Sequence, residues 1–203
     1  MVAVDVRKAV RVALDLLEAE GLDKLTVRRL ATALGVKAPA LYWHFASKRA
    51  LLDHLADAMV APVVDRLPPP GGPWLEWVEN AATALRGALL SHRDGARVAL
   101  GADLVVARSL GEFAERTVEV LHTAGFSLAD ATRVAGVLVQ FVLGRAVEEQ
   151  ARPDPAGEAA VLPSIPFPLM VRGMRERHEA GATAEDDFRF ALGILLAGLR
   201  SLR

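Results

Sequence analysis

The sequence contains no cysteine, so it can form neither a disulfide nor a thiolate metal site. It also lacks a long apolar segment: the longest nearly uncharged stretch, residues 134–144, is too short to cross a bilayer. Asp5, Arg7 and Lys8 stand where a secretory signal would begin its apolar region. These absences lead us to expect a cytoplasmic protein that has no membrane partner.

The common signatures of catalysis are missing as well. We find no nucleophile elbow, phosphate-binding loop or paired-carboxylate arrangement. The five histidines show neither the H-x-x-x-H nor the H-E-x-x-H spacing that binds a metal on a helix. We therefore predict that the protein is not an enzyme and that it uses no cofactor and no metal ion.

Helical periodicity is what the sequence does contain. Alternation of the β type is nearly absent, and apolar residues recur at helical spacing along most of the chain, which indicates an all-α fold. Thr26 and Ser47 are expected to cap helices at their N-termini, and Gly21 and Gly35 to end them. Helices are expected near residues 5–20, 26–34, 38–44, 48–64, 74–92, 93–103, 110–124, 128–150, 169–180 and 184–202.

Two proline-rich breaks interrupt this pattern. Residues 67–73 include three consecutive prolines and two glycines, and residues 152–168 include five prolines, so neither segment can continue a helix. The second break is expected to be a loop with room for one short helical turn. We predict an N-terminal domain at residues 1–47, a connecting helix at 48–66 and a larger helical domain at 67–203.

The N-terminal domain carries a basic segment with a helix-turn-helix pattern. Residues 24–50 contain six Lys or Arg and no Asp or Glu, which suits a polyanionic partner but equally fits a solvated surface. Leu30 and Leu34 face inward from one helix, Gly35 permits a sharp turn, and Leu41 fills the joint to the next helix. The pattern predicts that the second, short helix enters the major groove of DNA.

Nine residues are candidates for contact with double-stranded DNA. Tyr42, His44 and Lys48 suit phosphates, whereas the alanines and proline of the short helix offer apolar contacts, for instance with thymine methyl groups. The alternative is that the aromatic residues here belong to the core, as we expect for Phe45. The predicted DNA-binding residues are Arg28, Lys37, Ala38, Pro39, Ala40, Tyr42, Trp43, His44 and Lys48.

This segment resembles the DNA-binding region of the tetracycline-repressor family of transcriptional regulators. The resemblance continues into residues 88–101, 125–128, 143–150 and 190–199, which are similar to the drug-binding domain of the family's tetracycline-binding members. It implies a ligand-responsive repressor that binds a palindromic operator as a homodimer. The apolar helices at 128–150 and 184–202 would then form the dimer interface. The matching residues of the DNA-binding region are Thr26, Arg28, Leu30, Ala31, Gly35, Val36, Leu41, Tyr42, His44, Phe45, Lys48, Leu51 and Leu52.

The ligand site that the resemblance implies has lost most of its polar groups. Alignment places the metal-binding His of the tetracycline-binding members at Ala99, and a carboxylate survives only at Glu148. Because Mg²⁺ needs oxygen ligands, we expect a small, rather hydrophobic effector that binds without metal. Trp74 and Trp77 could line the cavity, but their spacing favours the core. The predicted ligand-binding residues are Val64, Ala81, Leu85, Ala99, Ala102, Thr117 and Glu148.

Two alternatives stay open at this point. The larger domain could be a closed core, which would make the protein a DNA-binding regulator with no effector. The protein could also activate transcription rather than repress it, because that depends on where the operator lies relative to the promoter.

Overall fold

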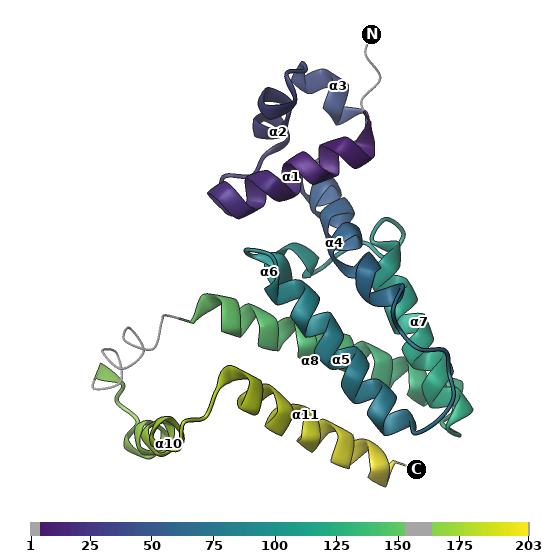
Figure 1. The fold of residues 1–203 in the computed structure, drawn as a ribbon, viewed down its shortest axis with the longest axis vertical. Coiled ribbons are helices and arrows are strands. Elements are labelled where there is room, and N and C mark those ends of the chain that lie inside the picture. The colour runs from purple at the N-terminus through teal and green to yellow at the C-terminus, as the bar shows by residue number, and fades with distance from the viewer. Residues whose placement is uncertain (1–4, 153–163, 203) are drawn as a thin grey trace. The chain divides into compact units, whose positions relative to one another are not determined.

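The computed structural model describes residues 5–152 and 164–202, and its elements in these ranges are helices (Figure 1). This confirms the predicted all-α fold. None of these helices combines the length and the apolar character needed to cross a membrane. In chain order the helices are α1 (Val6–Glu20), α2 (Val27–Leu34), α3 (Ala38–Tyr42), α4 (Lys48–Val64), α5 (Trp74–Leu90), α6 (Gly95–Ala99), α7 (Arg108–Thr123), α8 (Leu128–Ala151), α10 (Pro168–Glu179) and α11 (Ala184–Ser201).

Local capping explains where the first four helices begin and end. The hydroxyls of Thr26 and Ser47 accept hydrogen bonds from main-chain amides three residues later, and the Asp5 carboxylate does the same for the first turn of α1. Gly21 and Gly35 follow α1 and α2 with positive φ values of 82° and 66°, which glycine adopts without steric cost. The predicted caps and helix ends are confirmed.

Two of the predicted helices are shorter than expected. The helix predicted at residues 93–103 is wrong in length, because α6 covers Gly95–Ala99 alone. Asp94 before it has a φ of 56° and Gly101 after it a φ of 70°, and neither conformation continues a right-handed helix. The helix predicted to reach residue 44 ends at Tyr42, because the amides of His44 and Phe45 both turn back to the Leu41 carbonyl.

Helix α4 connects the small N-terminal bundle to the larger one. It packs against α1 near its start and against α5, α6 and α7 along the rest of its length (Figure 1). Leu51 and Leu55 on α4 are fully buried, as are Leu85 on α5 and Phe113 on α7. Helix α4 therefore contributes to the core of both bundles.

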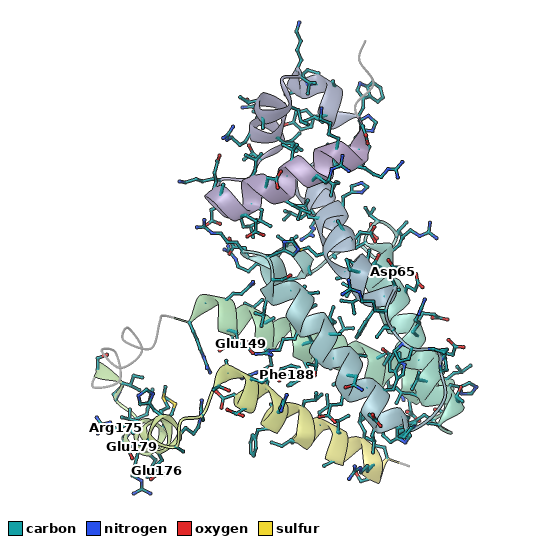
Figure 2. All side chains as sticks on the ribbon, viewed as in Figure 1. Asp65, Glu149, Arg175, Glu176, Glu179 and Phe188 are labelled. Carbon is teal, nitrogen blue, oxygen red and sulfur yellow. The ribbon has the colours of Figure 1, made fainter. Side chains whose placement is uncertain are left out.

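The chain divides into two compact units, residues 1–150 and 151–203. In the second unit, a capping box between Thr183 and Asp186 starts α11, and Asp187 forms ion pairs with Arg152 and Arg177. All of α10 is at least partly exposed, including Arg175 (Figure 2). Most of the proline-rich break predicted at 152–168 lies outside the described residues. The domain boundaries given above stay a prediction.

Candidate functional site

The turn between α2 and α3 holds these two helices together. Leu30 and Leu41 are fully buried and Ala31 nearly so. The Val36 amide donates to the Ala31 carbonyl at 3.0 Å, next to the left-handed Gly35. Because the apolar residues of both helices face one core, the opposite side of α3 is presented to solvent, as a helix-turn-helix requires.

The exposed side of α3 and the turn after it carries most of the predicted DNA contacts. Trp43 is 90% exposed and Tyr42 43% exposed, although aromatic side chains of this size usually pack inside. Phe45, two residues later, is fully buried with its ring edge-to-face against His54 at 5.3 Å. Phe45 is therefore a core residue as predicted, whereas Tyr42 and Trp43 do not fit the core alternative. Lys37, Pro39 and His44 are also exposed, and Ala38 and Ala40 are half-buried.

The basic residues of this region differ in the partners that their side chains already have within the protein. Arg28 is exposed, and neither it nor Lys37 forms an ion pair within the described ranges. Arg29 beside it pairs with Glu20, and the hydrogen bond from Arg29 holds the pKa of that carboxyl below its usual value. Lys48 is only half-buried, and its Nζ donates to the Leu22 carbonyl at 2.6 Å. A phosphate contact by Lys48 must therefore share or replace this bond.

Five of the seven predicted ligand-binding residues lie in the core of the larger bundle. Val64, Ala81, Leu85, Ala99 and Thr117 are each at most 3% exposed, and they come from α4, α5, α6 and α7, which pack on one another. The Thr117 hydroxyl donates to the carbonyl four residues before it at 2.8 Å, so its proton is already used. Ala102 is half-buried and Glu148 is exposed.

The predicted ligand-binding side chains offer few atoms that could bind a metal ion. Alanine, valine and leucine side chains offer no oxygen or nitrogen ligand. Within the described ranges, no group of three or more His, Cys, Asp or Glu side chains could hold a metal. The predicted residues are thus mostly apolar side chains packed in the core, with one exposed carboxylate at Glu148.

A groove of about 460 Å³ runs between α4 and α5, and sequence reasoning missed it. Small residues such as Ala58 on α4 and Ala84 and Ala88 on α5 leave this space, and Arg66 and Asn80 add polar groups to its lining. None of the seven predicted ligand-binding residues lines it. The alanines spaced four residues apart on α5 were the signal available in the sequence.

The two tryptophans of α5 anchor this helix. Trp77 is 4% exposed, and its Nε1 donates to the Pro68 carbonyl at 2.9 Å, which also fixes the proline-rich segment. Trp74 packs edge-to-face on Phe126 with ring centroids 5.3 Å apart. Trp77 is therefore a core residue as expected, whereas Trp74 is only half-buried against Phe126.

Two family descriptions match this chain and together cover most of it. Residues 9–55 match "Bacterial regulatory proteins, tetR family", and residues 67–203 match "Tetracyclin repressor-like, C-terminal domain". Tetracycline repressor protein class A from transposon 1721 of Escherichia coli is 39% identical over 197 residues, which are 96% of this chain and 89% of that protein.

Solved structures agree with the sequence comparison. A TetR variant from Acinetobacter baumannii AYE in complex with minocycline has a TM-score of 0.79 and 34% identity, covering 98% of this chain and 95% of that one. BioQ with its natural double-stranded DNA operator has a TM-score of 0.73 and 30% identity, covering 98% and 99%. The chain therefore belongs to the tetR family of bacterial regulatory proteins, and it is a ligand-responsive transcriptional repressor and not an enzyme.

Proposed function

We propose that this repressor acts in the cytoplasm, where a homodimer binds a palindromic operator through α2 and α3 and releases it when a small apolar effector enters the larger bundle. The observation that carries the proposal is the exposure of Tyr42 and Trp43 beside the buried Leu41 and Phe45. A short helix that buries one side in a helix-turn-helix core and exposes aromatic and basic residues on the other suits the major groove.

The chemistry of α3 favours phosphate contacts over hydrogen bonds to bases. Ala38, Pro39 and Ala40 carry no side-chain donor or acceptor, so they offer only apolar contacts to base edges. Tyr42 and His44 can donate to phosphate oxygens, and Arg28 on α2 can reach a phosphate or a guanine edge. Sequence preference would then depend on Arg28, on thymine methyl groups and on DNA shape.

Exposed apolar residues on α8 and on α11 support the homodimer. Leu128 and Val137 on α8 are 59% and 47% exposed, and Phe190 and Ile194 on α11 are 73% and 61% exposed. Phe190 and Ile194 are four residues apart and share one face of α11, and an exposed apolar face is typical of a helix that another helix covers. Leu128 and Val137 are nine residues apart and lie on different sides of α8. In such a dimer the two copies of α3 would read half-sites about 34 Å apart, one turn of DNA.

The buried set formed by Val64, Ala81, Leu85, Ala99 and Thr117 supports an apolar effector. A polar metal–drug chelate placed there would leave its oxygens without partners, which costs binding free energy. An apolar effector would stabilise the conformer that opens this core. Operator affinity would then fall by the factor by which the effector prefers that conformer.

Matched variants test the DNA interface. The protein is titrated onto an operator duplex obtained by in vitro selection, over a range of salt concentrations, as wild type, Arg28→Ala and Arg172→Ala. Arg172 is an exposed arginine on α10, outside the basic segment and the proposed dimer interface. If Arg28 contacts phosphate in both protomers, its loss lowers the slope of log K against log salt by about 2, whereas Arg172→Ala leaves the slope unchanged. Equal slopes for all three proteins contradict the proposed role of Arg28.

Calorimetry tests the effector chemistry. Titration of tetracycline with Mg²⁺ into the dimer is expected to give no tight binding, because Ala99 supplies no metal ligand. A screen of apolar compounds is expected to yield at least one that raises the melting temperature and releases the operator. Tight, Mg²⁺-dependent tetracycline binding would contradict the apolar site.

A further inference from the structure

The turn at residues 91–94, between α5 and α6, contacts two distant parts of the first compact unit at once. Its backbone is tightly folded: Asp94 is the one non-glycine residue with a positive φ in the described ranges. A Cβ added to Gly95 would lie 2.3 Å from the Leu89 carbonyl oxygen, so no larger residue fits there. One side of this turn contacts the end of α1, and the other contacts the end of α8.

Hydrogen bonds join the turn to the N-terminal bundle. The Glu18 carboxylate, near the end of α1, accepts a hydrogen bond from the Arg93 amide at 3.1 Å and lies 2.9 Å from Nδ1 of His92. The Leu22 amide, just after α1, donates to the Asp94 carboxylate at 2.9 Å. The end of α1 is thus bound to three of the four residues of the turn.

The side chain of Gln150, at the end of α8, holds the same turn from the other side. Its Oε1 accepts a hydrogen bond from the Ala96 amide at 3.1 Å. Its Nε2 donates to the His92 carbonyl at 2.7 Å and to the Leu89 carbonyl at 3.2 Å. One amide therefore binds the last turn of α5, the turn itself and the first turn of α6. The Leu89 carbonyl and the Ala96 amide belong to helix ends, whose backbone groups lack partners within the helix, and the His92 carbonyl also accepts a hydrogen bond from the Gly95 amide at 3.0 Å.

Gln150 does what the N-cap residue of α6 would ordinarily do. Asp94 occupies the N-cap position but makes no side-chain capping bond, because its carboxylate is engaged by Leu22 and Arg97. Gln150, 54 residues further along the chain, supplies the missing acceptor to Ala96. Asp94 thus occupies the N-cap position of α6 and binds the N-terminal bundle, whereas Gln150 on α8 supplies the capping hydrogen bond.

We propose that Gln150 is a positioning residue that sets the 91–94 turn and, through Glu18 and Leu22, the orientation of the DNA-binding bundle. A displacement of the end of α8 moves the turn or breaks the Gln150 hydrogen bonds. In both cases the hydrogen bonds that Glu18 and Leu22 form with the turn change. This inference rests on the proposed function, because it assigns to Gln150 a part in the operator-binding geometry. Glu148, the predicted effector contact, lies two residues earlier on the same helix.

Amide hydrogen exchange of the full-length dimer, without DNA or effector, tests the coupling. The amides of Leu22 and Arg93 donate to Asp94 and Glu18, and Gln150 touches neither of them. Gln150→Ala is expected to speed their exchange about tenfold or more, because the free energy needed to open the contact between the 91–94 turn and α1 becomes smaller. The control Glu119→Ala removes an exposed side chain from α7, outside the proposed dimer interface, and leaves both rates unchanged. Unchanged exchange at Leu22 and Arg93 in Gln150→Ala, with faster exchange confined to Ala96, would overturn the proposal.

A second variant separates positioning from simple loss of packing. Gln150→Glu keeps the acceptor for the Ala96 amide but cannot donate to the two carbonyls. Positioning through the His92 carbonyl predicts fast exchange at Leu22 and Arg93 with Ala96 still protected. Protection of all three amides in Gln150→Glu contradicts it.

Operator binding tests the proposed function separately from the positioning role of Gln150. Gln150→Ala is expected to weaken binding to the selected operator more than binding to a random duplex, because each DNA-binding bundle stays folded while the spacing of the two becomes less fixed. A wild-type dimer that selects no operator contradicts the proposed function, whatever the exchange rates show. Equal affinity losses on both duplexes contradict the positioning role.

Discussion

The buried ion pair between α5 and α8 gives the sharpest prediction about stability. Arg86 and Glu149 have side chains 9% and 6% exposed, and the Arg86 guanidinium donates to both carboxylate oxygens, at 2.8 Å from Nη2 and 3.0 Å from Nε. Arg86→Met keeps an unbranched side chain of similar reach but removes the charge. Glu149 then stays inside the protein without its cation.

Leaving one member of a buried pair without its partner costs about 3–5 kcal/mol. For a chain of this length, each kcal/mol lowers the melting temperature by about 2–4 °C, so Arg86→Met is expected to melt about 6–20 °C below the wild type. Calorimetry at one fixed protein concentration measures this difference, because the stability of a dimer depends on concentration. The control Arg172→Met breaks an exposed pair with Glu176 on α10 and leaves the melting temperature unchanged.

The double variant Arg86→Met with Glu149→Leu shows whether burial is the cause. Two apolar side chains in place of a buried pair are often neutral or stabilising, so the double variant is expected to regain most of the loss. A drop below about 2 °C for Arg86→Met, less than 1 kcal/mol, would refute the reasoning. So would a double variant that is less stable than the single one.

Three further predictions concern the N-terminal bundle and its joint. Leu41→Ala removes a fully buried side chain between α2 and α3 and is expected to cost about 2–5 kcal/mol, measured by urea unfolding; a loss under 1 kcal/mol contradicts the described packing. Thr26→Ala removes the cap of α2 and is expected to cost about 1 kcal/mol, whereas the exposed Thr132→Ala serves as control. Partial burial raises the pKa of Asp94, but hydrogen bonds from Leu22 and Arg97 outweigh it and hold this pKa below its usual value. A lowered carboxyl pKa stabilises the fold above the unfolded value and loses that effect as the pH falls through the folded value, so Asp94→Asn is expected to flatten the pH dependence of unfolding below about pH 4. An unchanged pH profile contradicts this assignment.

Local signals predicted the secondary structure of the N-terminal bundle well. The caps Thr26 and Ser47 and the glycines Gly21 and Gly35 act on their immediate neighbours, so their effect is readable without knowledge of the fold. The burial of Phe45, just after α3, was predicted as well. The predicted resemblance to the tetracycline-repressor family was confirmed over most of the chain.

Contacts between residues far apart in the chain were not predictable in this way. Helix α6 begins late because Asp94 turns its carboxylate to Leu22, 72 residues earlier. Gln150 binds backbone groups more than 50 residues away, and nothing in its local sequence marks it. Lys48 was predicted to face phosphate, and its bond to the Leu22 carbonyl likewise depends on how α1 and α4 pack. The role of Lys48 and of the other predicted site residues stays a prediction.

The most direct test of the account is a footprint of the purified dimer on the DNA that surrounds its own gene and the neighbouring genes, at a stated salt concentration. The account predicts one palindromic site, protected on one face of the duplex in two major-groove segments about 34 Å apart, and lost in Tyr42→Ala. Uniform protection that falls equally for every sequence as salt rises, or a footprint that Tyr42→Ala leaves intact, would contradict the claim that α3 reads an operator.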